Sequence, residues 1–167
     1  MAKTLQQKVV SALSKADLTL SCAESCTGGL IAKRITDVSG ASAVFHGGVV
    51  SYVNAVKQNV LGVSARDLEQ YGAVSAPVGR QMASGAARLL GTDLAVSTTG
   101  VAGPNPDDRG NAVGTVYVSL SAQGKTWCYL CHFDGNHAQV RRAAAEFALS
   151  LVLRYLSGAD MAEGALS

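Results

Sequence analysis

Charged residues are scarce in this sequence of 167 residues, because Asp, Glu, Lys and Arg together make up only 16% of it, against about a quarter in an ordinary globular chain. The formal net charge is +2 and no basic cluster occurs, which argues against nucleic acid as the main partner. Aromatic residues are also few, at 5%, so Ala, Val and Leu must build the core. Hydrophobic residues nevertheless reach 48%, which excludes intrinsic disorder.

The sequence also has no hydrophobic run of the length that a membrane span or a signal peptide needs. Residues 1–8 are mainly polar, and the most apolar late stretch, residues 143–156, is interrupted by Glu146 and Arg154. These absences predict a cytoplasmic protein with no membrane partner. In that compartment we expect the four cysteines to be reduced.

Two close cysteine pairs, Cys22 with Cys26 and Cys128 with Cys131, raise the alternative of a zinc site. The second pair lies in residues 126–133, which have the pattern of a β-strand. Residues three apart on a strand point to opposite faces, so these two thiols cannot bind one ion unless the strand breaks. We therefore expect reduced thiols and no metal.

Glycine, in contrast, is abundant, with 18 residues, and it separates segments of helical and strand-like periodicity. The predicted helices cover residues 5–17, 30–38, 54–62, 64–72, 75–90 and 138–156, and the predicted strands cover residues 18–23, 44–53, 94–98, 113–122 and 126–133. Helices separate the first three strands, whereas the last two form a hairpin. The pattern predicts an α/β protein, namely an α/β/α sandwich with a mixed, mostly parallel sheet.

The chain has no internal repeat and no linker, so we expect a single domain over residues 1–167. Its core should span about residues 5–156, with residues 157–167 as a flexible, frayed tail. Exposed alanine-rich helix faces favour a homo-oligomer, and we expect a dimer.

One candidate site is the segment Ala23-Glu-Ser-Cys-Thr-Gly-Gly29, which joins a strand to a helix. Glycines and free amides at such a turn can hold a phosphate or an oxyanion, although a tight packing turn explains the segment equally well. Ser25 and Cys26 are both candidate nucleophiles. A helix N-terminus lowers the pKa of a thiol, which favours Cys26. However, no histidine of the sequence has a recognisable catalytic context.

A lysine can instead act as the base for a serine, provided that it is neutral. If Asn54 is an N-cap, Lys57 is the third residue of a helix, where the helix dipole should lower its pKa. The alternative is an ordinary exposed lysine. A second candidate loop, residues 97–104, follows an apolar strand and carries hydroxyls and glycines, so it is either a nucleotide-binding loop or a long surface loop.

Several of these motifs occur together in a fixed order. They are Ala23-Glu-Ser-Cys-Thr-Gly-Gly29, Tyr52 with Asn54 and Lys57, Leu61-Gly-Val63, Tyr71-Gly-Ala-Val-Ser75, Thr99-Gly-Val-Ala-Gly-Pro104 and Val113-Gly-Thr-Val116. In this respect the chain resembles the CinA C-terminal domain family, the nicotinamide-nucleotide amidases. The resemblance extends from about residue 5 to residue 156.

The resemblance implies hydrolysis of the carboxamide of nicotinamide mononucleotide, which gives nicotinate mononucleotide and ammonia in pyridine-nucleotide salvage. It implies a serine–lysine mechanism without a metal or a cofactor. Ser25 would be the nucleophile, Lys57 the base, and Tyr52 a residue that orients Lys57 or relays the proton. The implied substrate-binding residues are Thr27 and Gly28 at the oxyanion, Thr99, Gly100 and Gly103 at the nucleotide, and Arg141 in the last helix.

The sequence also departs from the pattern of the family that it resembles. Ala55 replaces a common glutamate, Gln81 replaces another, and the loop 105–112 lacks the usual Lys-Pro. Arg109 could substitute for the missing lysine in phosphate binding. These departures leave a second hypothesis, a CinA-like nucleotide-binding paralogue with weak or no amidase activity.

Overall fold

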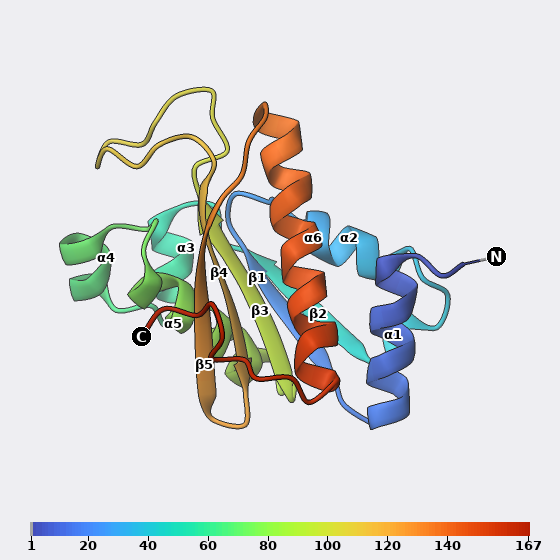
Figure 1. Ribbon diagram of the computed structural model, residues 1–167. Helices are drawn as coiled ribbons and strands as arrows, with labels where there is room; N and C mark the ends of the chain where they lie inside the picture. The colour runs from blue at the N-terminus through green and yellow to red at the C-terminus, as the bar shows by residue number, and fades with distance from the viewer. Residues whose placement is uncertain (1) are drawn as a thin grey trace.

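The alternation of helices and strands predicted from the glycine pattern is present in the computed structural model, which describes residues 2–167 (Figure 1). Most boundaries differ from the predicted ones by a few residues at most. In chain order the elements are α1 (Leu5–Ala16), β1 (Leu20–Glu24), α2 (Leu30–Thr36), the 3₁₀ helix η1 (Ala41–Ala43), β2 (Phe45–Val50), α3 (Asn54–Asn59), α4 (Ala65–Tyr71), α5 (Ala76–Leu90), β3 (Leu94–Gly100), β4 (Thr115–Ala122), β5 (Lys125–His132) and α6 (His137–Leu156).

The five strands form one mixed sheet in the order β2-β1-β3-β4-β5. The strands β2, β1 and β3 are parallel, and β4 and β5 continue the sheet as antiparallel neighbours. At the carboxyl ends of the parallel strands, Glu24 of β1 is in register with Val50 of β2 and Thr98 of β3. The loops that follow these three strands therefore leave the sheet at the same edge, where α/β proteins bind their ligands.

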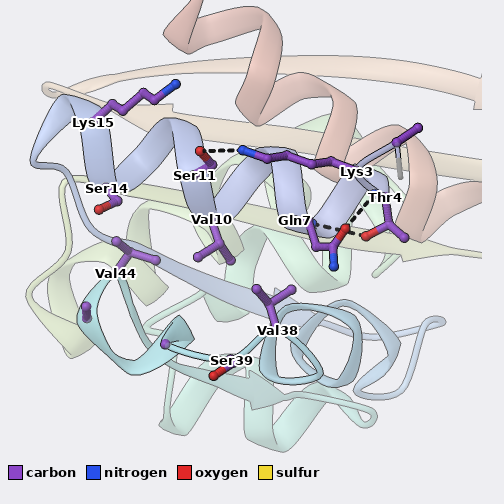
Figure 2. Close-up of a pocket in the computed structure, with 13 residues that line it drawn as sticks. Lys3, Thr4, Gln7, Val10, Ser11, Ser14, Lys15, Val38, Ser39 and Val44 are labelled. Atoms are coloured by element: carbon purple, nitrogen blue, oxygen red, sulfur yellow. Dashed lines mark hydrogen bonds between the residues drawn. The ribbon is translucent and has the colours of Figure 1, made fainter.

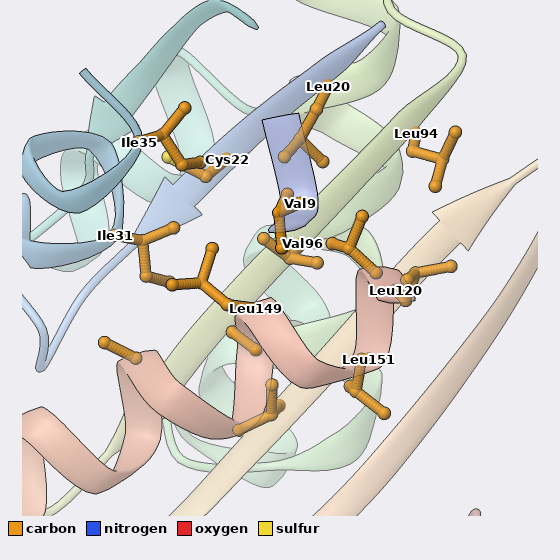
Figure 3. Close-up of a cluster of buried hydrophobic side chains, with 14 of the residues drawn as sticks. Val9, Leu20, Cys22, Ile31, Ile35, Leu94, Val96, Leu120, Leu149 and Leu151 are labelled. Carbon is orange, nitrogen blue, oxygen red and sulfur yellow. The ribbon is translucent and has the colours of Figure 1, made fainter. Parts of the chain in front are cut away.

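Helices cover both faces of the sheet, which confirms the predicted α/β/α sandwich (Figure 1). On one face α1, α2 and α6 enclose a core to which Val9, Ile31 and Leu149 contribute, and Figure 3 shows these side chains directed toward those of the strands. On the other face α5 packs on the sheet through Val78 and Met82. Small and branched aliphatic residues make up most of both cores, as the low aromatic content predicts.

Helix caps account for several of the boundaries. The Ser64 hydroxyl accepts from the amide of Asp67, as predicted for the start of α4, but the Asp67 carboxylate accepts from Gln81 instead of closing a capping box. The prediction for α3 is wrong by one residue. Asn54 is the first helical residue and Val53 is the N-cap, without a side-chain cap bond. The polar Asn54 was the local signal for the cap, but the extended residue before it, Val53, takes that position.

Within the last eleven residues, for which we predict a flexible tail, most side chains are exposed but two residues contact β5. Met161 is buried, and its carbonyl accepts a hydrogen bond from the hydroxyl of Tyr129 in β5. The amide of Leu166 donates to the carbonyl of Cys128 at 2.8 Å. Partners that lie about 35 residues away in sequence cannot be read from the polar composition of the tail.

The alanine-rich stretch of α6 faces the core. Ala144, Ala145 and Ala148 are buried, so they do not belong to an exposed alanine-rich face, and the expected dimer stays a prediction. Within residues 2–167, no helix combines the length and the hydropathy that a membrane span requires.

Candidate functional site

The loops after β1, β2 and β3 enclose a cavity of about 310 Å³ at the carboxyl edge of the parallel strands. Its walls include most of the predicted site residues, which are Ser25, Tyr52, Lys57, Thr99, Gly100 and Gly103. The remaining three, Thr27, Gly28 and Arg141, do not line the cavity. The two candidate loops of the sequence therefore form one site.

The predicted nucleophile and the predicted base are in direct contact. The Nζ atom of Lys57 lies 2.9 Å from Oγ of Ser25, and it also donates to the carbonyl of Ser51 at 2.7 Å. Lys57 is only 1% exposed, which overturns the alternative of an ordinary surface lysine. The side chain reaches the end of β1 from α3, and the Ser51 carbonyl at the end of β2 fixes its amine beside the serine.

The environment of Lys57 disfavours a positive charge. Burial lowers the pKa of Lys57 from its ordinary value of 10.5 to about 8, because the charged amine loses its hydration. The sequence predicts this direction but assigns it to the helix dipole. In the structure Lys57 is the fourth residue of α3, and burial is the cause. At pH 7 about a tenth of the amine is therefore neutral and free to accept a proton, and the neutral fraction rises to about half near pH 8.

Glu24, a residue to which the sequence alone assigns no role, organises residues 25–29, the nucleophile loop. Its carboxylate is 1% exposed and accepts hydrogen bonds from the Thr27 hydroxyl at 2.7 Å and from the amides of Ile31 and Ala32 at 2.8 and 3.1 Å. These amides are the unpaired donors at the start of α2. An acidic residue shortly before a glycine-rich helix start was the available signal for this capping role.

Thr27 and Arg141 support the same loop instead of lining the cavity. The Thr27 hydroxyl bonds Glu24 and also the hydroxyl of Thr98 in β3 at 2.8 Å. Arg141 of α6 donates from Nε to the carbonyl of Cys26 at 3.1 Å and from Nη2 to the carbonyl of Thr27 at 2.8 Å. Both residues thus hold the nucleophile loop between the sheet and α6.

These contacts determine which amides can face a substrate. The amide of Gly28 donates to the Ser25 carbonyl at 3.1 Å, and that of Ser25 donates to the Thr98 carbonyl at 3.0 Å, so both are occupied. This corrects the prediction that Gly28 stabilises an oxyanion through its amide. The amides of Cys26 and Thr27 donate to no backbone carbonyl within the described residues. Because N–H and C=O of a trans peptide point in opposite directions, Arg141 on the Cys26 carbonyl directs the Thr27 amide away from α6.

Cys26 follows Ser25 directly and lies beside the Ser25–Lys57 dyad, but its thiol is not activated. Burial raises the pKa of Cys26 to about 11, even though nearby Lys57 acts in the opposite direction. The sequence argument expected the helix start to lower this pKa, and desolvation outweighs that effect. The thiol therefore stays protonated near neutral pH, which favours Ser25 as the nucleophile.

Tyr52 occupies a different position from the predicted one. It borders the cavity, but the residue is 66% exposed, and its hydroxyl makes no hydrogen bond to Lys57 or Ser25 among the contacts of residues 2–167. The Ser51 carbonyl orients Lys57 instead. A main-chain partner of this kind leaves no trace in the sequence.

The second candidate loop, residues 97–104, lines the cavity with its main chain more than with its side chains. The Thr99 hydroxyl donates to the carbonyl of Ala73 at 2.7 Å, and a Cβ atom at Gly100 would lie 2.5 Å from the Thr115 carbonyl oxygen, so only glycine fits there. The guanidinium of Arg109 bonds the carbonyls of Glu69 and Gln70 at the end of α4. Arg109 is therefore turned away from the cavity and does not replace the missing loop lysine.

The other two cysteines lie on opposite faces of the sheet, as the strand periodicity predicts. Cys128 is near Ser119 and Arg80 on the α5 side, whereas Cys131 packs against the core on the α6 side. Within residues 2–167 no three His, Cys, Asp or Glu side chains gather in a way that could hold a metal ion.

A larger cavity of about 810 Å³ lies between α1 and the connection from α2 to β2 (Figure 2). Lys3 and Lys15 stand at the two ends of this groove, and Val10 projects from α1 toward the segment that carries Val38 and Val44. Lys3 donates to the hydroxyl of Ser11 at 3.2 Å. The groove contains none of the predicted site residues, so its greater size does not make it the candidate site.

Comparison with known proteins connects this geometry to a family. Residues 2–156 match the model of the CinA C-terminal domain. The chain belongs to the CinA family. The residues matched to the CinA model include Ser25, Lys57, Glu24 and the loop of residues 97–104. The match ends at the last residue of α6.

Relatives at the sequence level are longer than this CinA domain. A putative competence-damage inducible protein of Thermoanaerobacter pseudethanolicus is 45% identical over 154 residues, and a CinA-like protein of Geotalea daltonii is 47% identical over the same length. Each alignment covers 92% of this chain but 37% of the relative. The chain thus spans little more than a third of these curated relatives.

Solved CinA structures, in contrast, correspond to the chain over almost their full length. A CinA superfamily protein from Klebsiella pneumoniae has a TM-score of 0.90 and 32% identity, covering 92% of this chain and 96% of that one. A competence/damage inducible protein from Agrobacterium tumefaciens has a TM-score of 0.86 and 35% identity, with coverages of 92% and 93%. These similarities agree with the α/β sandwich.

Proposed function

We propose that the protein is a serine–lysine amidohydrolase that converts nicotinamide mononucleotide to nicotinate mononucleotide and ammonia, in the salvage of pyridine nucleotides. The observation that carries this proposal is the buried contact of 2.9 Å between Lys57 Nζ and Ser25 Oγ at the wall of a cavity. The substrate follows from the family resemblance. All four cysteines are free thiols, which supports a cytoplasmic location.

In the first half of the reaction, neutral Lys57 accepts the proton of Ser25 while Oγ attacks the carboxamide carbon. The amides of Cys26 and Thr27, which donate to no backbone carbonyl among the described residues, are the candidate donors to the negative oxygen that forms. The Lys57 ammonium then gives its proton to the amide nitrogen. The C–N bond breaks, ammonia leaves, and an ester remains on Ser25.

In the second half of the reaction, a water molecule enters where ammonia has left and hydrolyses the ester on Ser25. Neutral Lys57 accepts a proton from the water molecule as its oxygen attacks the ester carbon. The bond to Ser25 Oγ then breaks, and Lys57 returns the proton to the serine as the nicotinate product leaves. One amine therefore serves in both halves, which requires a pKa near the working pH. Burial supplies this condition by lowering the pKa of Lys57 to about 8.

An ammonia-release assay with nicotinamide mononucleotide tests the proposal. We expect Ser25→Ala and Lys57→Ala to lose at least about 10³-fold in kcat, as removal of a nucleophile or its base does elsewhere. Cys26→Ala should retain most of the activity. Ser42→Ala and Lys33→Ala, at exposed positions, are matched controls. Unchanged rates in the first two variants, or a loss confined to Cys26→Ala, would contradict the mechanism.

A nucleotide-binding paralogue with weak or no amidase activity is the second candidate. The position of Arg109 favours it, because this side chain is bound to carbonyls of α4 and does not replace the missing loop lysine. Calorimetry with nicotinamide and nicotinate mononucleotides separates the two candidates. Binding without ammonia release would identify the paralogue, whereas rapid release would exclude it.

A further inference from the structure

One wall of the cavity carries a histidine that the proposed reaction does not use. His137 is the first residue of α6 and lines the cavity together with Ser25 and Lys57. Its Nδ1 atom lies 2.8 Å from the carbonyl oxygen of Gly103. A carbonyl can only accept, so Nδ1 carries a proton in this contact. In the neutral ring Nε2 is then an acceptor with a free lone pair.

The same wall contains a second acceptor. Asp107 also lines the cavity, and it lies four residues after Gly103, the residue that His137 contacts. Partial burial works against its ionisation, but hydrogen bonds from the side chain and amide of Asn111 and from the amide of Arg109 prevail and lower the pKa of Asp107. The group is therefore a carboxylate near neutral pH. This wall offers acceptors and negative charge to whatever enters the cavity.

The wall stands beside the nucleophile loop and not on it. His137 and Arg141 are four residues apart on α6, so they share a helix face and lie about 6 Å apart along its axis. Arg141 is bonded to the carbonyls of Cys26 and Thr27, next to Ser25. Since His137 and Ser25 line the same cavity, a substrate with its carboxamide at Ser25 can present its neighbouring group to His137.

We propose that His137, with Asp107, recognises hydroxyl groups of the sugar that is attached to the reacting carboxamide ring. This inference rests on the proposed function and names His137 as a specificity-determining residue. Hydroxyls are the donors that an imidazole nitrogen and a carboxylate can bind. A phosphate brings further acceptors, and neither Nε2 of the neutral ring nor the Asp107 carboxylate can donate a hydrogen bond to it. The sugar, and not the phosphate, is recognised at this wall.

Two substitutions of His137 test the Nε2 acceptor separately from the contact between Nδ1 and the Gly103 carbonyl. His137→Asn keeps a donor close to the position of Nδ1, for the Gly103 carbonyl, and removes Nε2. His137→Gln places an amide oxygen near the position of Nε2. We expect His137→Asn to raise KM for nicotinamide mononucleotide about tenfold with kcat unchanged, the effect of one lost hydrogen bond. His137→Gln should recover most of that loss.

The substrate itself provides the matched test. The 2′,3′-dideoxy analogue of nicotinamide mononucleotide should bind the native chain and His137→Asn equally. His132→Asn, an exposed histidine of β5, and Asp108→Asn, an exposed neighbour of Asp107, are controls without an expected change. An unchanged KM in His137→Asn, with ammonia still released, would overturn the inference and leave the proposed function standing.

Calorimetry keeps the inference testable if no ammonia is released at all. In that case the proposed function fails, but the affinities of the native chain and of His137→Asn for nicotinamide mononucleotide can still be compared. Binding about tenfold weaker in His137→Asn, with no difference for the dideoxy analogue, would support the sugar site. Equal affinities would overturn it.

Discussion

Lys57 is a buried cation without a counter-charge when it is protonated. Its partners are the Ser25 hydroxyl and the Ser51 carbonyl, and neither of the two ion pairs within residues 2–167 includes it. A low-dielectric environment therefore favours the neutral amine. Burial of this amine lowers the folding stability at neutral pH, and it also lowers the pKa of the amine, so that a neutral base is available. Such a combination is common at active sites.

The pH dependence of ammonia release should report this lysine. The folded-state pKa of Lys57 lies below its ordinary value, so the active neutral form appears as the pH rises. We expect kcat/KM for nicotinamide mononucleotide to fall about tenfold per pH unit below about 8 and to level off above it. Lys57→Arg should be inactive throughout, because a guanidinium does not lose its proton. pH–rate profiles of the native chain and of Lys33→Arg measure this. A flat profile between pH 6 and 9 would contradict it.

At the scale of residues, sequence reasoning identifies chemical types better than their surroundings. It selects Ser25 and Lys57, because few other nucleophiles and bases stand at strand ends in a chain this poor in charge. It misassigns the cause of the lysine pKa and the role of Tyr52, because burial depends on how distant segments pack. It also passes over Glu24, whose hydrogen bonds form only once β1 and α2 meet.

At the scale of elements, the turn from β1 to α2 depends on one buried carboxylate. The N-cap of α2 is Gly29, which has a φ of 102° and no side chain to cap the helix. Glu24 takes over that function from the strand and accepts from the amides of Ile31 and Ala32. The position of Ser25, the next residue, is thereby coupled to the start of the helix.

Glu24→Gln tests this coupling. Loss of the charge weakens the hydrogen bonds to the two amides and leaves an amide group buried among donors. We expect the free energy of unfolding to decrease by about 1–3 kcal/mol and kcat to fall with it, as Ser25 shifts from Lys57. Urea denaturation and the ammonia assay provide the two readouts. Glu69→Gln, at an exposed position, is the control. Equal stability of the two variants would show that Glu24 is not the cap.

Local signals predict most elements, and long-range contacts account for the misses. Ser64 and the Ser75–Pro77 start of α5 are correctly placed, since caps and proline act within one turn. The N-cap of α3 lies one residue earlier than predicted and has no side-chain signal, and the contacts of residues 161 and 166 with β5 depend on partners elsewhere in the chain. The mixed sheet follows from the order of helices and strands, but its register does not.

At the scale of the whole molecule, residues 157–167 extend the CinA domain across β5. The family match ends at residue 156, yet beyond it the Met161 and Leu166 carbonyls accept from Tyr129 and Arg80. The Leu166 amide also pairs with β5. This segment therefore covers part of an edge strand, which sheets generally protect from pairing with other chains.

Deletion of residues 158–167 should lower Tm without a change in kcat. The deletion exposes the surface that buries Met161 and removes the hydrogen bonds to β5, while the cavity with Ser25 and Lys57 is lined by other residues. A loss of 2–3 kcal/mol corresponds to a decrease in Tm of about 4–12 °C for a chain of this size. Thermal unfolding followed by circular dichroism measures it. An unchanged Tm would mean that the segment contributes no stability.

The partner that holds Lys57 in place belongs to the main chain, since it is the carbonyl of Ser51. Every amino acid has this carbonyl, so mutation of residue 51 does not delete the anchor of the base. The contact between Lys57 and residue 51 therefore depends on the path of the main chain and not on the side chain of residue 51. Ser51 is fully buried and its hydroxyl donates to the Glu24 carbonyl, so a small residue such as alanine at position 51 should leave the anchor in place, whereas a large side chain would displace it.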